Sequence, residues 1–97
     1  MEREISAKDL KNILSQNKNI VLLDVRSKQE YNEGHLNGSI SIPYYEIESK
    51  IDKIISNKKT MIVVYCEHGT RSKNVVKKLH KFGYENVFNL KNGLEGI

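Results

Sequence analysis

The sequence predicts an α/β fold in which a mainly parallel sheet is covered by helices on both faces. Short apolar runs rich in β-branched residues alternate along the chain with segments whose apolar residues recur at helical spacing. This alternation is typical of parallel sheets, because each helix returns the chain to the edge where the next strand begins. The 97 residues fit one domain of ordinary small size, extending from 1 to 97.

The N-terminal third of the chain is expected to form a helix, a strand and a second, shorter helix. Residues 6–9 resemble a capping box at the start of the first helix. After a turn at 17–19, residues 20–25 form a nearly continuous apolar run, as in a strand buried on both faces of a sheet. Ser27 then caps a helical segment that ends near Gly34. The apolar stripe of the first helix consists of Leu10, Ile13 and Leu14.

The alternation continues to the end of the chain. A short strand at 40–43, closed by the only proline, precedes a helix. The strand at 60–65 leads into a helix at about 72–82, and Gly83 sits where a C-cap glycine belongs. The last segments are a strand at 87–90 and the start of a final helix at 92–97. The residues at helical spacing are Ile47, Ile51, Ile54 and Ile55 in the first of these helices and Val75, Val76, Leu79 and Phe82 in the second.

Composition and charge argue against several classes of function. The net charge is +4 and the pI about 9.2, but the lysines are spread along the chain, so nucleic-acid binding is not expected. No apolar stretch approaches the roughly 18 residues that a membrane span needs, and the charged N-terminus lacks the apolar region of a signal peptide. No exposed apolar stripe is evident. We therefore expect a cytoplasmic monomer that binds neither nucleic acid nor membranes.

The loop after the strand at 60–65 is the most informative segment. Cys66, the only cysteine, stands at the carboxyl end of this strand and just before a helix. The backbone N–H groups of such a loop, together with the positive end of a helix, bind anions and favour the thiolate form of a cysteine. Gly69 lets the loop curl, and Arg71 supplies a permanent charge with a planar set of donors. We therefore expect Cys66 to be a nucleophile rather than an inert buried residue.

The neighbouring side chains have narrower expected roles. Ser72 either caps the helix or donates a hydrogen bond to the cysteine sulfur. His68 is too close to Cys66 in the chain to act as its base, so we expect it at the mouth of the pocket, with Glu67 pointing outward. The chain has one cysteine, so no internal disulfide is expected. His68 and Glu67 lack the additional ligand residues that a zinc site needs, so no metal or cofactor is expected.

Three segments resemble the rhodanese homology domain over nearly the whole chain. CEHGTRS, at 66–72, is similar to the Cys-x-x-Gly-x-Arg-Ser active loop of that family. LLDVRSKQEYNEGHLNGSISIP, at 22–43, resembles its second hallmark, and FGYENVFNLKNG, at 82–93, resembles the segment that forms the last strand. The resemblance implies a rhodanese-like three-layer fold with a central, mainly parallel, five-stranded sheet. It also implies a sulfurtransferase that works by double displacement and needs no cofactor or metal.

The resemblance also implies residue roles. Cys66 takes a sulfane sulfur from a small donor anion such as thiosulfate, or from a persulfide, and passes it to cyanide, a small thiol or a protein thiol. Asp24 and Arg26 match an Asp-Val-Arg motif and are interpreted mainly as charges that support the fold, with orientation of the active loop as the alternative. His35 is interpreted as a hydrogen-bonded turn residue. The substrate cradle consists of Glu67, His68, Gly69, Thr70 and Arg71, supported by Ser72.

Some features depart from the family pattern, and other functions stay open. Glu67 is acidic where thiosulfate-specific members often have basic residues, and the chain ends soon after the last strand, so we expect a short final helix. Phosphatases and arsenate reductases of this fold are the first rival. Their wider loop places five residues between Cys and Arg, whereas four separate Cys66 from Arg71 and no second cysteine is present to resolve an arsenate adduct. The second rival is a non-enzymatic binding or sulfur-relay module.

Overall fold

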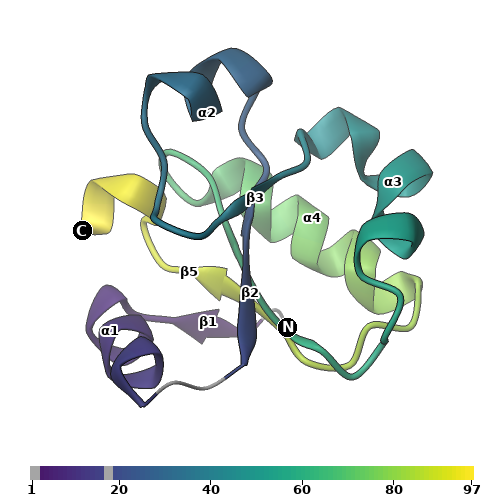
Figure 1. The fold of residues 1–97 in the computed structure, drawn as a ribbon, viewed down its shortest axis with the longest axis horizontal. Coiled ribbons are helices and arrows are strands. Elements are labelled where there is room, and N and C mark those ends of the chain that lie inside the picture. Colours follow the sequence, from purple (N-terminus) through teal and green to yellow (C-terminus); the bar gives the residue numbers. More distant parts are fainter. Residues whose placement is uncertain (1–2, 17–18) are drawn as a thin grey trace.

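The computed structural model describes residues 3–16 and 19–97, so the turn expected at 17–19 falls mostly outside the described residues. Five strands form one sheet in the order β1-β5-β4-β2-β3, and all neighbouring strands are parallel (Figure 1). The prediction of a three-layer α/β fold with a five-stranded, mainly parallel sheet is thus confirmed. The strands are β1 (Glu4–Ile5), β2 (Ile20–Asp24), β3 (Ile40–Ser41), β4 (Met61–Tyr65) and β5 (Val87–Leu90).

Helices cover both faces of the sheet. α1 lies on one face, α3 and α4 pack on the other, and α2 lies beyond the carboxyl ends of the strands (Figure 1). Side chains of β4 alternate between the two faces: Ile62, Val64 and Cys66 join the core under α3 and α4, while Val63 and Tyr65 join the core under α1. No helix in the described part of the chain combines the length and apolar character needed to cross a bilayer. The helices are α1 (Ala7–Ser15), α2 (Lys28–Glu33), α3 (Ile47–Ile54) and α4 (Thr70–Lys81).

Local capping residues set several helix ends as expected. The Ser6 side chain accepts a hydrogen bond from the N–H of Asp9 at 3.0 Å, which satisfies one of the unpaired donors at the start of α1. Ser27 and Glu30 form a reciprocal capping box at the start of α2. At the end of α4, Gly83 has a φ of +95°, and the chain turns away through hydrogen bonds that return to the last helical carbonyls.

Other boundaries differ from the sequence prediction. α4 begins at Thr70 rather than Ser72, because Gly69, at a φ of +99°, is its N-cap and lets the helix start inside the loop. Phe82 lies just beyond this helix and is 37% exposed, so it does not belong to the buried face. The final helix is a 3-10 turn, η2 (Gly93–Gly96), and another 3-10 turn, η1 (Tyr44–Glu46), precedes α3. The two-residue β1 is too short to produce a sequence pattern.

η2 packs directly against the loop that follows β4. The N–H groups of Leu94 and Glu95 donate to the carbonyl oxygens of Cys66 and Glu67, at 3.0 and 3.1 Å. Gly93 comes so close that a Cβ added there would overlap the Cys66 carbonyl and lie 2.7 Å from the Glu67 oxygen. Only glycine fits this position, so the C-terminal turn holds the loop backbone in place.

This close approach predicts unequal effects for two glycine substitutions. Gly93→Ala and Gly38→Ala both place a side chain at positive φ, but nothing lies within 4 Å of a Cβ at Gly38. Gly38→Ala should therefore lower the free energy of unfolding by about 1–2 kcal/mol. Gly93→Ala should cost about 1–3 kcal/mol more, because the loop must move. Urea denaturation measures both, and equal losses would contradict this account of Gly93.

Candidate active site

The ends of β2 and β4 bring the two sequence motifs together. Asp24 and Tyr65 are paired in the sheet register, and the N–H of Val25 donates to the Tyr65 carbonyl at 3.1 Å. Arg26 and Cys66 thus leave neighbouring parallel strands at the same edge. Ligands of open α/β sheets bind at this edge, because the loops there leave the sheet in different directions and form a crevice.

Cys66 is surrounded by donors from the start of α4. The N–H groups of Gly69 and Ser72 donate to its sulfur at 3.1 and 3.4 Å, and the Ser72 hydroxyl lies 3.3 Å from it. The Cys66 residue is only 1% exposed. Two roles are expected for Ser72 from the sequence, a helix cap or a hydrogen bond to the sulfur. Ser72 lies in the first turn of α4 and not at its N-cap, so the structure supports the contact with sulfur. The positive end of the α4 dipole adds to these donors.

These donors change the ionisation of the thiol. Burial raises the pKa of Cys66 because it disfavours the charged sulfur. Hydrogen bonds from the Ser72 side chain and from the backbone N–H groups of Ser72, Gly69 and His68 act in the opposite direction. They outweigh burial, and the pKa of Cys66 lies below its ordinary value. The site therefore favours a thiolate, which is the nucleophilic form of cysteine.

The Arg71 guanidinium is bound to a carboxylate from α2. Its Nη1 and Nη2 atoms donate to Oε1 and Oε2 of Glu30 at 2.9 and 3.0 Å, and its charge lies 5.9 Å from the centre of the Tyr44 ring. The bonds from Arg71 lower the pKa of Glu30 to about 2 against the opposing effect of burial, and bonds from Ser27 add to the lowering. Arg71 is thus positioned by Glu30, and three of the five N–H donors of its guanidinium lie outside this pair.

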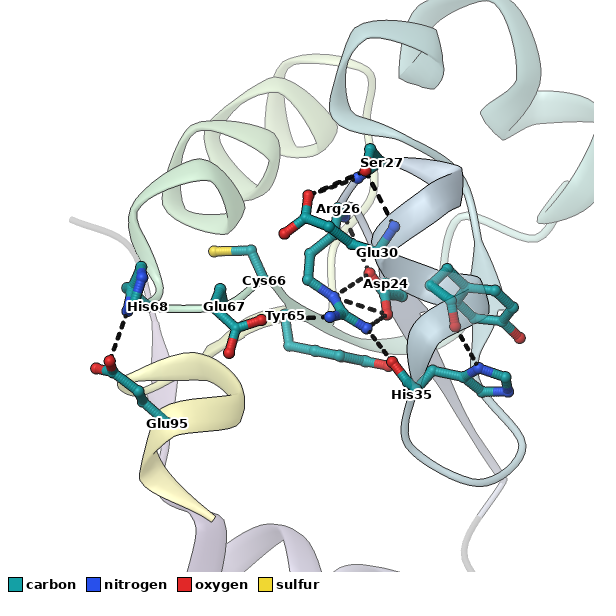
Figure 2. Close-up of polar contacts among 12 residues, drawn as sticks. Asp24, Arg26, Ser27, Glu30, His35, Tyr65, Cys66, Glu67, His68 and Glu95 are labelled. Atoms are coloured by element: carbon teal, nitrogen blue, oxygen red, sulfur yellow. Dashed lines mark hydrogen bonds and ion pairs between the residues drawn. The ribbon is translucent and has the colours of Figure 1, made fainter.

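Arg26 connects three segments at the sheet edge (Figure 2). Its Nη2 lies 2.8 Å from Asp24 Oδ2, and both residues are buried, with Asp24 0% and Arg26 4% exposed. The same guanidinium donates to the Gly34 carbonyl at 2.5 Å and to Glu67 Oε1 at 3.3 Å. Glu67, expected to point outward, is partly exposed but paired with Arg26. The contacts of Arg26 therefore fit both interpretations of the Asp-Val-Arg motif, support for the fold and orientation of the active loop.

The remaining loop side chains lie away from the sulfur. His68 Nδ1 is 3.0 Å from Glu95 Oε2, and both side chains are 63% exposed (Figure 2). Thr70 is exposed at the first position of α4. His35 Nδ1 lies 2.8 Å from the Tyr31 carbonyl, the contact expected of a turn histidine. Within the described ranges, no group of three or more His, Cys, Asp or Glu side chains is arranged to hold a metal ion.

Sequence reasoning missed two residues of this region. Glu30 stands three positions after the N-cap Ser27, where the sequence signals a capping box, whereas its contact with Arg71 spans 41 positions. Asn89 on β5 is fully buried and accepts a hydrogen bond from the Ser72 hydroxyl. A polar residue inside an otherwise apolar strand was the one available signal for Asn89, because a buried amide needs a partner.

Comparisons with known proteins agree with this architecture. A family model described as "Rhodanese-like domain" matches residues 6–97. A crystal structure of a rhodanese-like domain protein from Staphylococcus aureus has a TM-score of 0.89 at 28% identity and covers 97% of this chain and 89% of that one. Thiosulfate sulfurtransferase PspE of Escherichia coli (strain K12) is 33% identical over 75 residues, which are 77% of this chain and 71% of PspE.

Other curated relatives are much longer than this chain. The tRNA uridine(34) hydroxylase of Buchnera aphidicola subsp. Baizongia pistaciae is 33% identical over 94 residues. The match covers 93% of this chain but only 30% of the hydroxylase. The domain therefore occurs both in relatives of similar length and as one part of larger proteins.

The buried charges predict the effect of removing Asp24. Asp24→Ala leaves the Arg26 charge buried without its partner, and we expect the free energy of unfolding to fall by about 3–5 kcal/mol. In the control Asp24→Leu/Arg26→Met both charges are absent, so the loss should be smaller. The alkylation rate of Cys66 per folded molecule should change little in Asp24→Ala. If Asp24→Ala melted like the natural protein but its Cys66 no longer reacted, the interpretation of Asp24 as mainly a charge that supports the fold would be contradicted.

Proposed function

The chain belongs to the rhodanese-like domain family, and from this premise we propose that it is a sulfurtransferase in which Cys66 carries the sulfur as a persulfide. The observation that carries the proposal is the set of N–H donors aimed at the Cys66 sulfur from the start of α4. They favour a thiolate and can hold an anionic sulfur attached to it. The name of the PspE relative, a thiosulfate sulfurtransferase, supports the same chemistry.

The proposed reaction has two displacements. In the first, the Cys66 thiolate attacks the sulfane sulfur of the donor. A bond forms between the two sulfurs, and the donor's S–S bond breaks, so that sulfite or a thiolate leaves with the electron pair. In the second, the acceptor attacks the outer sulfur of the persulfide, and Cys66 leaves as a thiolate. Ping-pong kinetics follow from the covalent intermediate.

The loop geometry favours a sulfur atom over a phosphate group. Four residues separate Cys66 from Arg71, one fewer than in the phosphatases of this fold. This smaller ring supports sulfur transfer over phosphate or arsenate chemistry.

We propose that a persulfide is a better donor than thiosulfate. Glu67 follows Cys66 directly, and its side chain is 39% exposed, so it adds negative charge to the loop that carries the sulfur. A dianion such as thiosulfate is repelled more strongly by this charge than a donor with less negative charge. Acceptors are a small thiol, cyanide or a protein thiol.

We also propose a cellular compartment for this reaction. A free, reactive thiol such as Cys66 suits a reducing compartment, and we propose the cytoplasm. The interpretation of 1–97 as a single domain that acts as a monomer stays a prediction. No nucleic acid or membrane takes part in the proposed reaction.

The persulfide cycle is tested by intact mass. After incubation with thiosulfate or with a cysteine persulfide, the protein should gain one sulfur atom, and cyanide should remove it with release of thiocyanate. The control Cys66→Ser should gain none. Loading by the persulfide alone supports the altered donor preference. Failure with both donors would reject the sulfurtransferase and favour the binding module.

The donor preference predicts the effect of neutralising Glu67. Glu67→Gln should raise the rate of loading by thiosulfate by about three- to fivefold, because one repulsive charge is lost near the entering dianion. Glu85→Gln is the matched control, since the exposed Glu85 precedes β5 at the opposite edge of the sheet. Stopped-flow measurement of loading compares the two variants. An equal effect of both would show that Glu67 does not select the donor.

A further inference from the structure

The Ser72 hydroxyl has one hydrogen and three acceptors within reach. It lies 3.3 Å from Cys66 Sγ and 3.1 Å from the Gly69 carbonyl, and it also donates to Oδ1 of Asn89. Ser72 and Asn89 are both 0% exposed, so no solvent takes the place of a missing partner. The acceptor that holds this hydrogen therefore determines how many donors the sulfur has.

The orientation of the Asn89 side-chain amide is set by Glu4 on the neighbouring strand β1. Glu4 and Asn89 are paired in the register of β1 and β5, and Asn89 Nδ2 donates to Glu4 Oε2 at 3.3 Å. A carboxylate only accepts hydrogen bonds, so it selects the NH₂ end of the amide. The oxygen end of Asn89 consequently faces Ser72 and competes with the sulfur for its hydrogen.

We propose that Asn89 is a positioning residue that holds the Ser72 hydroxyl hydrogen and so limits the stabilisation of the Cys66 thiolate. In the thiol state, the Cys66 S–H donates to Ser72 Oγ, and the hydroxyl donates to Asn89. When the thiol proton leaves to solvent, the hydroxyl can turn to the sulfur only by leaving the buried Asn89 oxygen without a donor. Such an unpaired buried acceptor is unfavourable.

The consequence for chemistry rests on the proposed sulfur transfer. A thiolate that is strongly stabilised is a weaker nucleophile, because nucleophilicity falls with the pKa of the thiol. Because the Ser72 hydroxyl stays on Asn89, the donors left to the Cys66 sulfur are mainly backbone N–H groups. These lower the pKa of Cys66, and the hydroxyl does not lower it further. The buried amide of β5 thus tunes a sulfur that belongs to β4 and α4.

Charged and titratable side chains near the sulfur and near Asn89 come from several elements and are unchanged in the variants below. They are Glu4 on β1, Asp24 on β2, Arg26 after β2, Glu30 on α2, Tyr44 on η1, Tyr65 on β4, Glu67 and His68 in the loop, Arg71 and Lys73 on α4, and Glu95 on η2. Shifts in the thiol titration therefore report the hydroxyl and its partners.

The test is the pKa of the Cys66 thiol, measured from the rate of iodoacetamide alkylation against pH. Asn89→Leu should lower this pKa by about half to one pH unit, which gives roughly three- to tenfold more thiolate below the midpoint. In Ser72→Ala/Asn89→Leu the pKa should equal that of Ser72→Ala alone, since Asn89 acts only through the hydroxyl. No shift, or the same shift with and without Ser72, would overturn the proposal.

A second measurement leaves the buried Asn89 in place. In the natural chain the hydroxyl should stay on Asn89 when Cys66 ionises, so the NMR signals of the Asn89 side-chain amide should move through the Cys66 titration only as far as they do in Ser72→Ala. The signals of the exposed Asn74 on α4 serve as the reference for the pH dependence of the sample. A titration of the Asn89 amide with the Cys66 midpoint that Ser72→Ala removes would show that the hydroxyl turns to the sulfur and would overturn the proposal. Because neither measurement needs a sulfur donor, failure of sulfur transfer and failure of the Asn89 role are distinguishable.

Discussion

The buried ion pair between Asp24 and Arg26 is the interaction on which the arrangement of the site depends. Each charge would be costly alone in the interior, so each requires the other. In addition to its bonds with Asp24, the Arg26 guanidinium donates to the Gly34 carbonyl and to the Glu67 carboxylate. One guanidinium thereby connects the end of β2, the end of α2 and the active loop. The interpretations of this pair as support for the fold and as an orienter of the loop are compatible, because Arg26 contacts both Asp24 and Glu67.

The active loop separates its donors from its acceptors. Its N–H groups at Gly69 and Ser72 face the Cys66 sulfur, while the carbonyls of Cys66 and Glu67 face away and are bound by the N–H groups of η2. A buried backbone must satisfy both kinds of group. Because η2 satisfies the carbonyls, the loop can keep its N–H groups directed at an anion. Gly93 makes this possible, since any side chain there would collide with the loop.

The ionisation of Cys66 is a balance of opposing effects. Burial disfavours the thiolate, and the donors of α4 favour it strongly enough to lower the pKa. The backbone donors are fixed by the helix, whereas the Ser72 hydroxyl can rotate between partners. Our proposal assigns the control of that rotation to Asn89. The reactivity of the sulfur then depends on β5 and β1 as well as on the strand and helix that carry the motif.

The sequence by itself determined the features that arise from neighbours along the chain. Apolar runs predicted β2 and β4, capping residues such as Ser6 and Ser27 predicted helix starts, and the Cys66 loop predicted the site, because each depends on contacts within a few residues. Only the tertiary structure decided the pairing of β1 with β5, the binding of Arg71 by Glu30 and the contact of Ser72 with Asn89. These partners are far apart in the chain and follow no periodic pattern. Their contacts exist because parallel strands bring distant segments to one edge of the sheet.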